Sequence, residues 1–62
     1  MKIAYAKQYG NMVSLYDQNN REYVRISGEL VSYTSEFVIT RGSGINGPKH
    51  IYNACGRRVR DI

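Results

Sequence analysis

The sequence of 62 residues has no tryptophan and contains one cysteine, one histidine and one proline. A single thiol, Cys55, cannot form an internal disulfide, and a single imidazole, His50, cannot complete a Cys/His ligand set of zinc spacing. We therefore expect neither a metal nor another cofactor. Because a chain of this length has room for only one thin core, small domains without such staples commonly rely on a partner subunit. Association with a second copy is thus an open alternative.

Long apolar runs are also absent from the sequence. Charged residues interrupt every apolar stretch, and none approaches the roughly 18 residues that cross a membrane. Residues 1–7 lack the apolar run of about seven residues that a signal peptide needs. A lone thiol is typical of a reducing compartment. We therefore expect a cytoplasmic protein with no membrane partner.

The apolar residues do not recur at the helical spacing i, i+3, i+4 and i+7 over three turns. The six tyrosines and the many valines, isoleucines and threonines favour strands, and they form short alternating runs separated by turn residues. We predict a single small β domain over residues 1–62, all-β, with little or no helix. Its expected architecture is an antiparallel meander of about six strands that forms a compact barrel or a strongly bent sheet.

Alternation along these runs predicts which side chains point into the core. The expected core residues are Ile3, Tyr5, Val13, Leu15, Val24, Ile26, Val31, Phe37, Ile39, Ile51 and Val59. The residues expected on the other faces are polar, basic or aromatic, namely Lys2, Ser14, Tyr16, Tyr23, Arg25, Ser32, Tyr52, Arg58 and Arg60.

Two hairpins resemble each other at a spacing of 36 residues, when residues 15–26 are aligned without gaps on residues 51–62. The matching positions are Tyr16 with Tyr52, Arg21 with Arg57, Ile26 with Ile62, Asp17 with Asn53 and Asn20 with Gly56. Since the turn residues have the same chemistry, we predict one hairpin geometry for both segments. The sequence leaves open whether this reflects duplication or two solutions to one turn problem.

The formal net charge of +4 is distributed unevenly along the chain. Residues 1–40 contain four cations and four acids, whereas residues 41–62 contain five cations and one acid. Such asymmetry favours a polyanionic or acidic partner, although a net charge also serves solubility alone.

Motifs of catalytic proteins are either absent or out of context. Gly42, Gly44 and Gly47 match the G-x-G-x-x-G pattern of dinucleotide-binding folds, which requires a helix directly afterwards. Because Pro48 and a predicted strand follow instead, an exposed loop over residues 42–48 is the better interpretation. The one ordinary candidate base, His50, lies in a predicted strand next to positive charge, and the acids lie at predicted turns or strand ends. We therefore predict no enzymatic activity.

The candidate binding residues are Arg41, Lys49, His50, Tyr52, Arg57, Arg58 and Arg60, with Tyr16, Tyr23 and Arg25 as further candidates. Cations neutralise phosphates while aromatic faces stack on bases, a combination found in small β-barrels that bind single strands. We therefore predict a small non-enzymatic binding module whose basic C-terminal hairpin contacts the backbone of DNA or RNA.

Two other functions remain open at this point. The chain also fits an accessory or inhibitor protein, of the kind that phages and mobile elements encode, which binds an acidic host protein or pairs through a strand edge. A third alternative is a structural piece that associates with copies of itself. Partner, nucleic-acid type and oligomeric state do not follow from the sequence.

Overall fold

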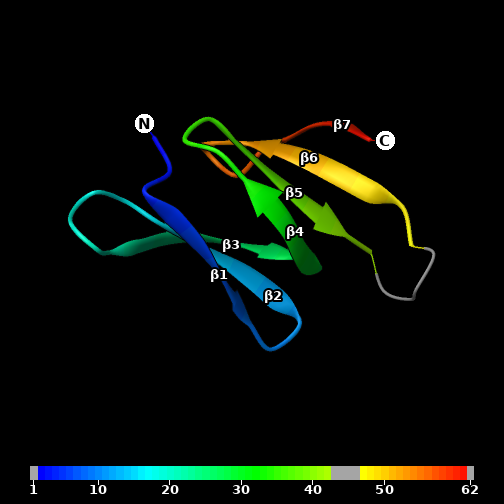
Figure 1. Cartoon of the computed structure of the whole chain (residues 1–62), viewed down its shortest axis with the longest axis horizontal. Helices are drawn as coiled ribbons and strands as arrows, with labels where there is room; N and C mark the ends of the chain where they lie inside the picture. Colours follow the sequence, from blue (N-terminus) through cyan, green and yellow to red (C-terminus); the bar gives the residue numbers. More distant parts are fainter. Residues whose placement is uncertain (1, 43–46, 62) are drawn as a thin grey trace.

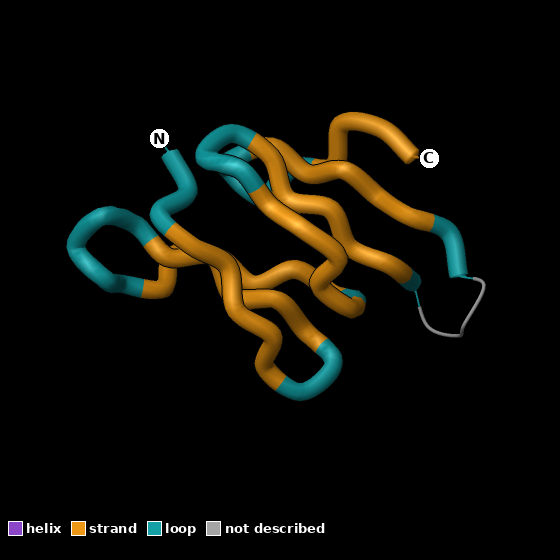
Figure 2. The backbone as a smooth tube through the Cα atoms, in the orientation of Figure 1, coloured by secondary structure: helices purple, strands orange, loops and turns teal. Residues whose placement is uncertain are grey.

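The computed structural model describes residues 2–42 and 47–61, which form seven strands in two antiparallel sheets (Figures 1 and 2). The first sheet has the order β1 (Tyr5–Tyr9), β2 (Met12–Tyr16) and β3 (Glu22–Ser27). The second sheet has the order β4 (Glu29–Tyr33), β5 (Phe37–Arg41), β6 (Lys49–Asn53) and β7 (Arg58–Asp61). Among the described residues, no helix is long and apolar enough to cross a membrane.

The predicted all-β, hairpin-rich class is confirmed, but two finer expectations are wrong. There are seven strands rather than about six, and they form two separate sheets rather than a closed barrel. The physical reason lies at Gly28, the one residue between β3 and β4, where the chain leaves the first sheet. From there β4 starts a new ladder with β5 and lies against β1 and β2. Part of the predicted loop, residues 43–46, lies outside the described residues.

The corner at Gly28 admits no side chain. Its φ is +121°, and a Cβ there would lie 2.8 Å from the carbonyl oxygen of Arg41. The side chain of Gln8 holds the corner in place, because its Nε2 donates to the Gly28 carbonyl at 3.1 Å and its Oε1 accepts from the Leu30 N–H at 2.6 Å. One glutamine therefore ties the first sheet to the start of the second.

The two similar hairpins share one turn geometry, as predicted. In each turn the first residue, Asp17 or Asn53, accepts backbone N–H bonds at its Oδ1 from the residues two and four positions later, at 2.9 to 3.0 Å. The fourth residue has a positive φ in both turns, 65° at Asn20 and 86° at Gly56. A β-bulge follows at the same place in each ladder. An Asx side chain that bonds its own turn, followed by a left-handed residue, explains the match.

The core lies between the two sheets and is only partly the predicted one. The buried apolar residues are Ile3, Ala6, Val13, Leu15, Ile26, Val38 and Ala54. Three predicted core residues are instead exposed, with fractions of 40% for Val31, 44% for Phe37 and 49% for Val59. Tyr5, Val24, Ile39 and Ile51 are half-buried.

The prediction chose the wrong side of β5 as the core side, because this strand has apolar residues on both sides. Val38 and Thr40 point toward the first sheet and are fully buried, so Phe37 and Ile39 point away from it. The core side of β6 is reversed in the same way, because Tyr52 pairs with the buried Val38 and Ile51 pairs with Ile39. Two other residues expected on outer faces also differ in burial. Tyr23, at the β-bulge of β3, packs against the core, and Ser14 lies on the expected side of β2 but is only 1% exposed. Tyr52 packs against the core as well.

Candidate interaction surface

The second sheet divides the seven predicted binding residues between its two sides. Thr40 is fully buried and pairs with His50, whereas Ile39 pairs with Ile51 on the opposite side. Because side chains alternate along a strand, these pairs define an inner side toward the first sheet and an outer side away from it. The inner side carries His50, Tyr52 and Arg58, the outer side carries Arg41, Lys49 and Arg60, and Arg57 lies in the turn before β7.

The polar groups of the inner side are largely paired with one another. The Nδ1–H of His50 donates to Oδ1 of Asp61 at 2.7 Å, and Nε of Arg58 lies 3.8 Å from the same oxygen. The hydrogen bond from His50, with a smaller contribution from the positive charges of Arg58 and His50, holds the pKa of Asp61 below its usual value against the opposing effect of desolvation. Asp61 thus neutralises part of the charge that the sequence places in the last hairpin.

Tyr52 does not offer a free ring for stacking. Its side chain is half-buried and packs against the core cluster. With His50 it lines a cleft of about 680 Å³ between the β1–β2 turn, the Gly28 corner and the ends of β5 and β6. The amide of Gln8 also lines this cleft, but it is already bonded to backbone groups. Four further polar residues, Asn11, Ser27, Glu29 and Arg41, also line the cleft, so Arg41 borders both the cleft and the outer side of the sheet.

Alternation puts Phe37, Ile39 and Ile51 on the outer side of the second sheet. The exposed Val31 and Val59 are β-bulge residues that face the same partners as Ser32 and Arg60, which assigns them to the outer side as well. Ile39 and Ile51 form a cross-strand pair at its centre, and Phe37 follows Ile39 on the same side of β5. Val31 and Val59 lie at β-bulges in the two edge strands. We call this side of the sheet the open face, because no other layer of the described protein covers it.

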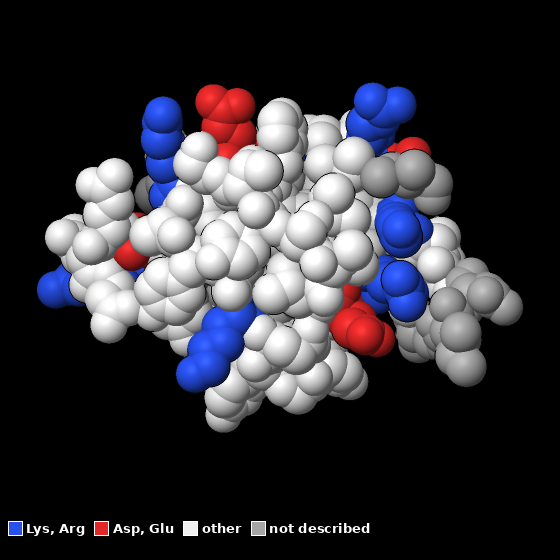
Figure 3. All heavy atoms as spheres, viewed as in Figure 1, with Lys and Arg blue, Asp and Glu red and all other residues white. Residues whose placement is uncertain are grey.

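Cations lie beside the apolar centre of the open face. Arg41 and Lys49 are direct cross-strand partners, and Arg60 lies opposite Ile51. None of the three forms a salt bridge with another described residue, although Glu29 lies across from Arg41 on β4. In the space-filling view, Lys and Arg side chains gather at the right-hand end of the molecule, over the ends of β5 and β6 (Figure 3). The open face therefore combines an apolar centre with cations that form no salt bridge among the described residues.

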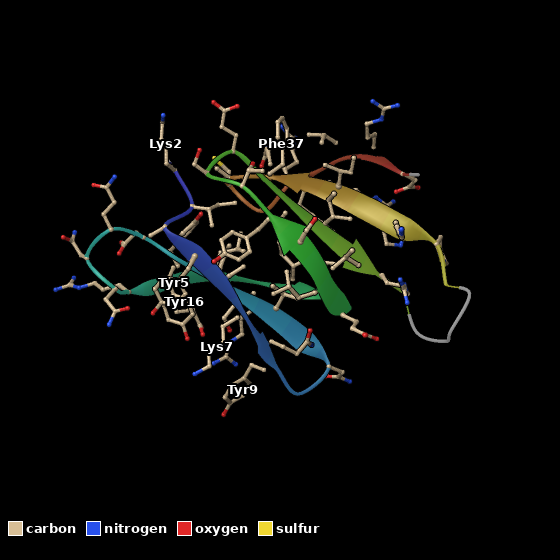
Figure 4. All side chains as sticks on the ribbon, in the orientation of Figure 1. Lys2, Tyr5, Lys7, Tyr9, Tyr16 and Phe37 are labelled. Carbon is tan, nitrogen blue, oxygen red and sulfur yellow. The ribbon has the colours of Figure 1, made fainter. Side chains whose placement is uncertain are left out.

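The outer side of the first sheet carries three tyrosines, Tyr5, Tyr9 and Tyr16. Tyr5 and Tyr16 stack on each other with ring centroids 4.4 Å apart, and the guanidinium of Arg25 lies 5.1 Å from the ring centroid of Tyr9. Figure 4 shows Tyr5 and Tyr16 side by side and Tyr9 beyond Lys7 toward the β1–β2 turn, with Phe37 away from them on the second sheet. Arg25 also bonds Glu22 at 2.8 Å, so its charge is already matched. Tyr16 and Arg25 do not join the C-terminal cations.

Tyr23, the remaining candidate, connects the two sheets. Its hydroxyl donates to the carbonyl oxygen of Ala54 at 2.5 Å, in the turn between β6 and β7. Burial, with a smaller contribution from the negative charges of Cys55 and Asp17, raises the pKa of Tyr23 above its usual value. This residue therefore links the first sheet to the turn between β6 and β7.

Comparisons with known proteins add no functional assignment: no family model, no curated protein and no solved structure matches the chain. The described residues also contain no group of three or more His, Cys, Asp or Glu side chains that could hold a metal ion. The open face was not predicted from the sequence, because its five apolar residues were all expected in the core. Alternation groups such residues on one side of a sheet, but it does not show whether another layer covers that side.

Proposed function

We propose that this chain is a non-enzymatic binding module that docks on an acidic protein through its open face. The observation that supports this proposal most directly is the apolar centre of that face, together with the unpaired Arg41, Lys49 and Arg60 beside it. Exposed apolar patches with polar margins are typical of protein interaction sites. Complementary charge then selects the partner and its orientation.

The composition of the open face favours a protein over a nucleic acid. Nucleic-acid sites on small β proteins place several exposed aromatic rings among cations, so that bases stack while phosphates are neutralised. The centre of the open face is aliphatic apart from Phe37, and phosphates gain nothing from aliphatic groups. The basic C-terminal hairpin remains part of the proposed surface, with Arg60 and Lys49 contacting carboxylates rather than phosphates.

The edge of the second sheet is a weaker candidate than its face. The strand β7 carries Arg58 and Arg60 and is interrupted by a β-bulge at Val59. Charged residues and bulges are the features with which native proteins prevent pairing at exposed strand edges. We therefore place the partner on the face of the sheet and not along β7.

The test begins with affinity capture by the tagged chain from nuclease-treated extract of its source cells. Each captured protein is then purified and titrated against the wild-type chain and against the double variant Phe37→Glu/Val59→Glu. Both positions are exposed, so the fold should tolerate the substitutions, which amide NMR spectra would verify. We expect a one-to-one complex whose dissociation constant rises by at least about tenfold in the double variant, and also rises with salt.

The matched control is Tyr9→Glu, which places a carboxylate at an exposed aromatic position of the first sheet. This variant should bind as the wild type does. Equal binding by Phe37→Glu/Val59→Glu, or recovery of nucleic acid alone before nuclease treatment, would overturn the proposal.

A further inference from the structure

We infer that the partner segment recognised by the open face is an amphipathic α-helix, acidic along one flank, that lies across the strands. The inference rests on the proposed function and goes further, because it names the kind of segment that binds. Its basis is the shape of the apolar surface and the position of the cations relative to it.

Four apolar side chains form a row that crosses the second sheet from edge to edge. Ile39 and Ile51 are paired at its centre. The β-bulge in β4 puts Val31 beside Ser32, which pairs with Ile39, and the β-bulge in β7 puts Val59 beside Arg60, which pairs with Ile51. We call Val31, Ile39, Ile51 and Val59 the apolar stripe. It spans three inter-strand spacings, about 14 Å, and runs perpendicular to the strands.

The β2–β3 hairpin, which resembles the β6–β7 hairpin, has the corresponding side covered by the second sheet. When residues 51–62 are aligned on residues 15–26, Ile51, Val59 and Arg60 correspond to Leu15, Tyr23 and Val24. These three residues of the first hairpin pack in the core beneath the second sheet. In the second hairpin the corresponding side faces away from the first sheet and meets no other described layer. This side of the hairpin is therefore suited to packing against a further layer of protein.

The dimensions of the stripe fit a helix. A helix rises about 1.5 Å per residue, so about ten residues cover 14 Å and present apolar side chains at i, i+3, i+7 and i+10. Neighbouring rows on the same side of the sheet lie two residues away along each strand, about 7 Å on either side. One of these rows contains Phe37, and the other contains Glu29, Arg41 and Lys49 as consecutive cross-strand partners, with a net positive charge. A helix about 10 Å wide therefore fits over the stripe between the two rows.

The charges specify one flank of that helix. Arg41 and Lys49 lie directly opposite each other, an arrangement of like charges that is unfavourable in the free protein. Carboxylates on one side of a bound helix would pair with both, while Phe37 would contact the apolar or neutral side. An acidic flank therefore both orients the helix and relieves the repulsion.

The same features disfavour two other occupants. On the open face of a second copy, the described strands carry the same three cations and one carboxylate, Glu29, so a second copy does not supply the acidic flank. A partner sheet in the aligned mode would run nearly parallel to β4–β7, whereas the stripe crosses these strands. A sheet in the orthogonal mode would run along the stripe, and the strand-patterned peptide described below tests that occupant. A helix has an apolar face with the direction and length of the stripe and also carries an acidic flank.

Designed peptides of about 14 residues test the inference. The helical peptide carries leucines at i, i+3, i+7 and i+10 and glutamates along one flank. A second peptide has the same composition with leucines in strand alternation, and a third replaces the glutamates of the helical peptide by lysines. Binding to the isotope-labelled chain is followed by amide NMR shifts, and peptide helicity by circular dichroism. We expect the helical acidic peptide to gain helicity and to bind at least about tenfold more tightly than either control peptide.

Variants locate the contact. The shifts should centre on β5 and β6, and the double variant Arg41→Gln/Lys49→Gln should weaken binding at least about fivefold. The control Lys2→Gln/Lys7→Gln removes two cations outside the second sheet and should leave binding unchanged. If the strand-patterned peptide binds as tightly as the helical one, or if the shifts fall outside the open face, the helix inference is overturned. The proposed function is judged separately, by the capture experiment with Phe37→Glu/Val59→Glu.

Discussion

Tyr23 contributes a single hydrogen bond that joins the two layers. Its half-buried hydroxyl donates to the Ala54 carbonyl, 31 positions along the chain. The substitution Tyr23→Phe keeps the ring and leaves this acceptor without its donor, so we expect a loss of about 1 to 2 kcal/mol in the free energy of unfolding. Urea denaturation measures the change. The control Tyr9→Phe, at a position that is 63% exposed, should change stability by less than about 0.5 kcal/mol, and an equal loss in both variants would contradict this role.

The raised pKa of Tyr23 also predicts how the free energy of unfolding changes at alkaline pH. Because burial raises this pKa in the folded state, the stabilising contribution is complete below the unfolded pKa of about 10 and is lost as pH rises through the folded value. Wild-type stability should therefore fall above about pH 10 more steeply than that of Tyr23→Phe. Parallel pH profiles for the two proteins would show that Tyr23 is not the group responsible.

The lowered pKa of Asp61 predicts a loss of stability at acidic pH. The hydrogen bond from His50 lowers the pKa of Asp61, so its contribution is present above the unfolded pKa of about 3.9 and is lost as pH falls through the folded value. At pH 6, Asp61→Asn should have a lower melting temperature than the wild type, and the difference should vanish at the acidic end of the titration. The control Glu36→Gln removes an exposed carboxylate from a turn and should show no such convergence. A difference that persists at low pH would contradict the assignment to Asp61.

At the scale of strands and turns, the sequence predicted local chemistry better than packing. The hairpin turns were predictable because Asp17 and Asn53 bond their own backbone, an interaction confined to a few neighbouring residues. The inner side of β5 was not predictable, because Phe37, Val38 and Ile39 are all apolar. Only the position of β4 and the first sheet decides which of them is covered. For the same reason, the open face was hidden among the predicted core residues.

The turn between β6 and β7 provides a matched pair of glycine substitutions. Gly56 and Gly10 both have positive φ, 86° and 61°. A Cβ at Gly56 would lie 2.8 Å from Cγ2 of Val24, a stiff side chain in the first sheet, whereas a Cβ at Gly10 meets nothing within 4 Å. We expect Gly10→Ala to cost about 1 kcal/mol from backbone strain, and Gly56→Ala to cost about 1 to 3 kcal/mol more.

Thermal and urea unfolding of both alanine variants measure these costs. Gly56→Ala should also disturb the amide signals of β3, because the turn packs on Val24 there. Equal losses in the two variants would mean that only the backbone conformation matters, and that the turn does not pack tightly on the first sheet.

For the whole molecule, the distinction between one closed barrel and two sheets depends on contacts between residues far apart in the sequence. Gly28 and Gln8 make the corner, yet neither has a sequence signal beyond that of an ordinary turn or strand residue. The uneven charge was visible at once, but its division between two sides of one sheet required the register of β5, β6 and β7. His50 and Arg58 both contact Asp61 on the inner side, so the cations of the second sheet that have no salt bridge among residues 2–42 and 47–61 lie mainly on the open face.

The two sheets should nevertheless unfold together. They share one core, and the hydrogen bonds that connect them include Tyr23 to Ala54, Leu30 to Gln8, and the backbone N–H of Ile3 to the carbonyl of Ser35. A chain this small should therefore show a single cooperative transition. Since the chain has no tryptophan, Phe37→Trp places a fluorescent reporter on an exposed position of the second sheet. The stacked Tyr5 and Tyr16 report on the first sheet through near-ultraviolet circular dichroism. We expect both probes to give the same urea midpoint, whereas an earlier transition at the tryptophan would mean that the second sheet opens on its own.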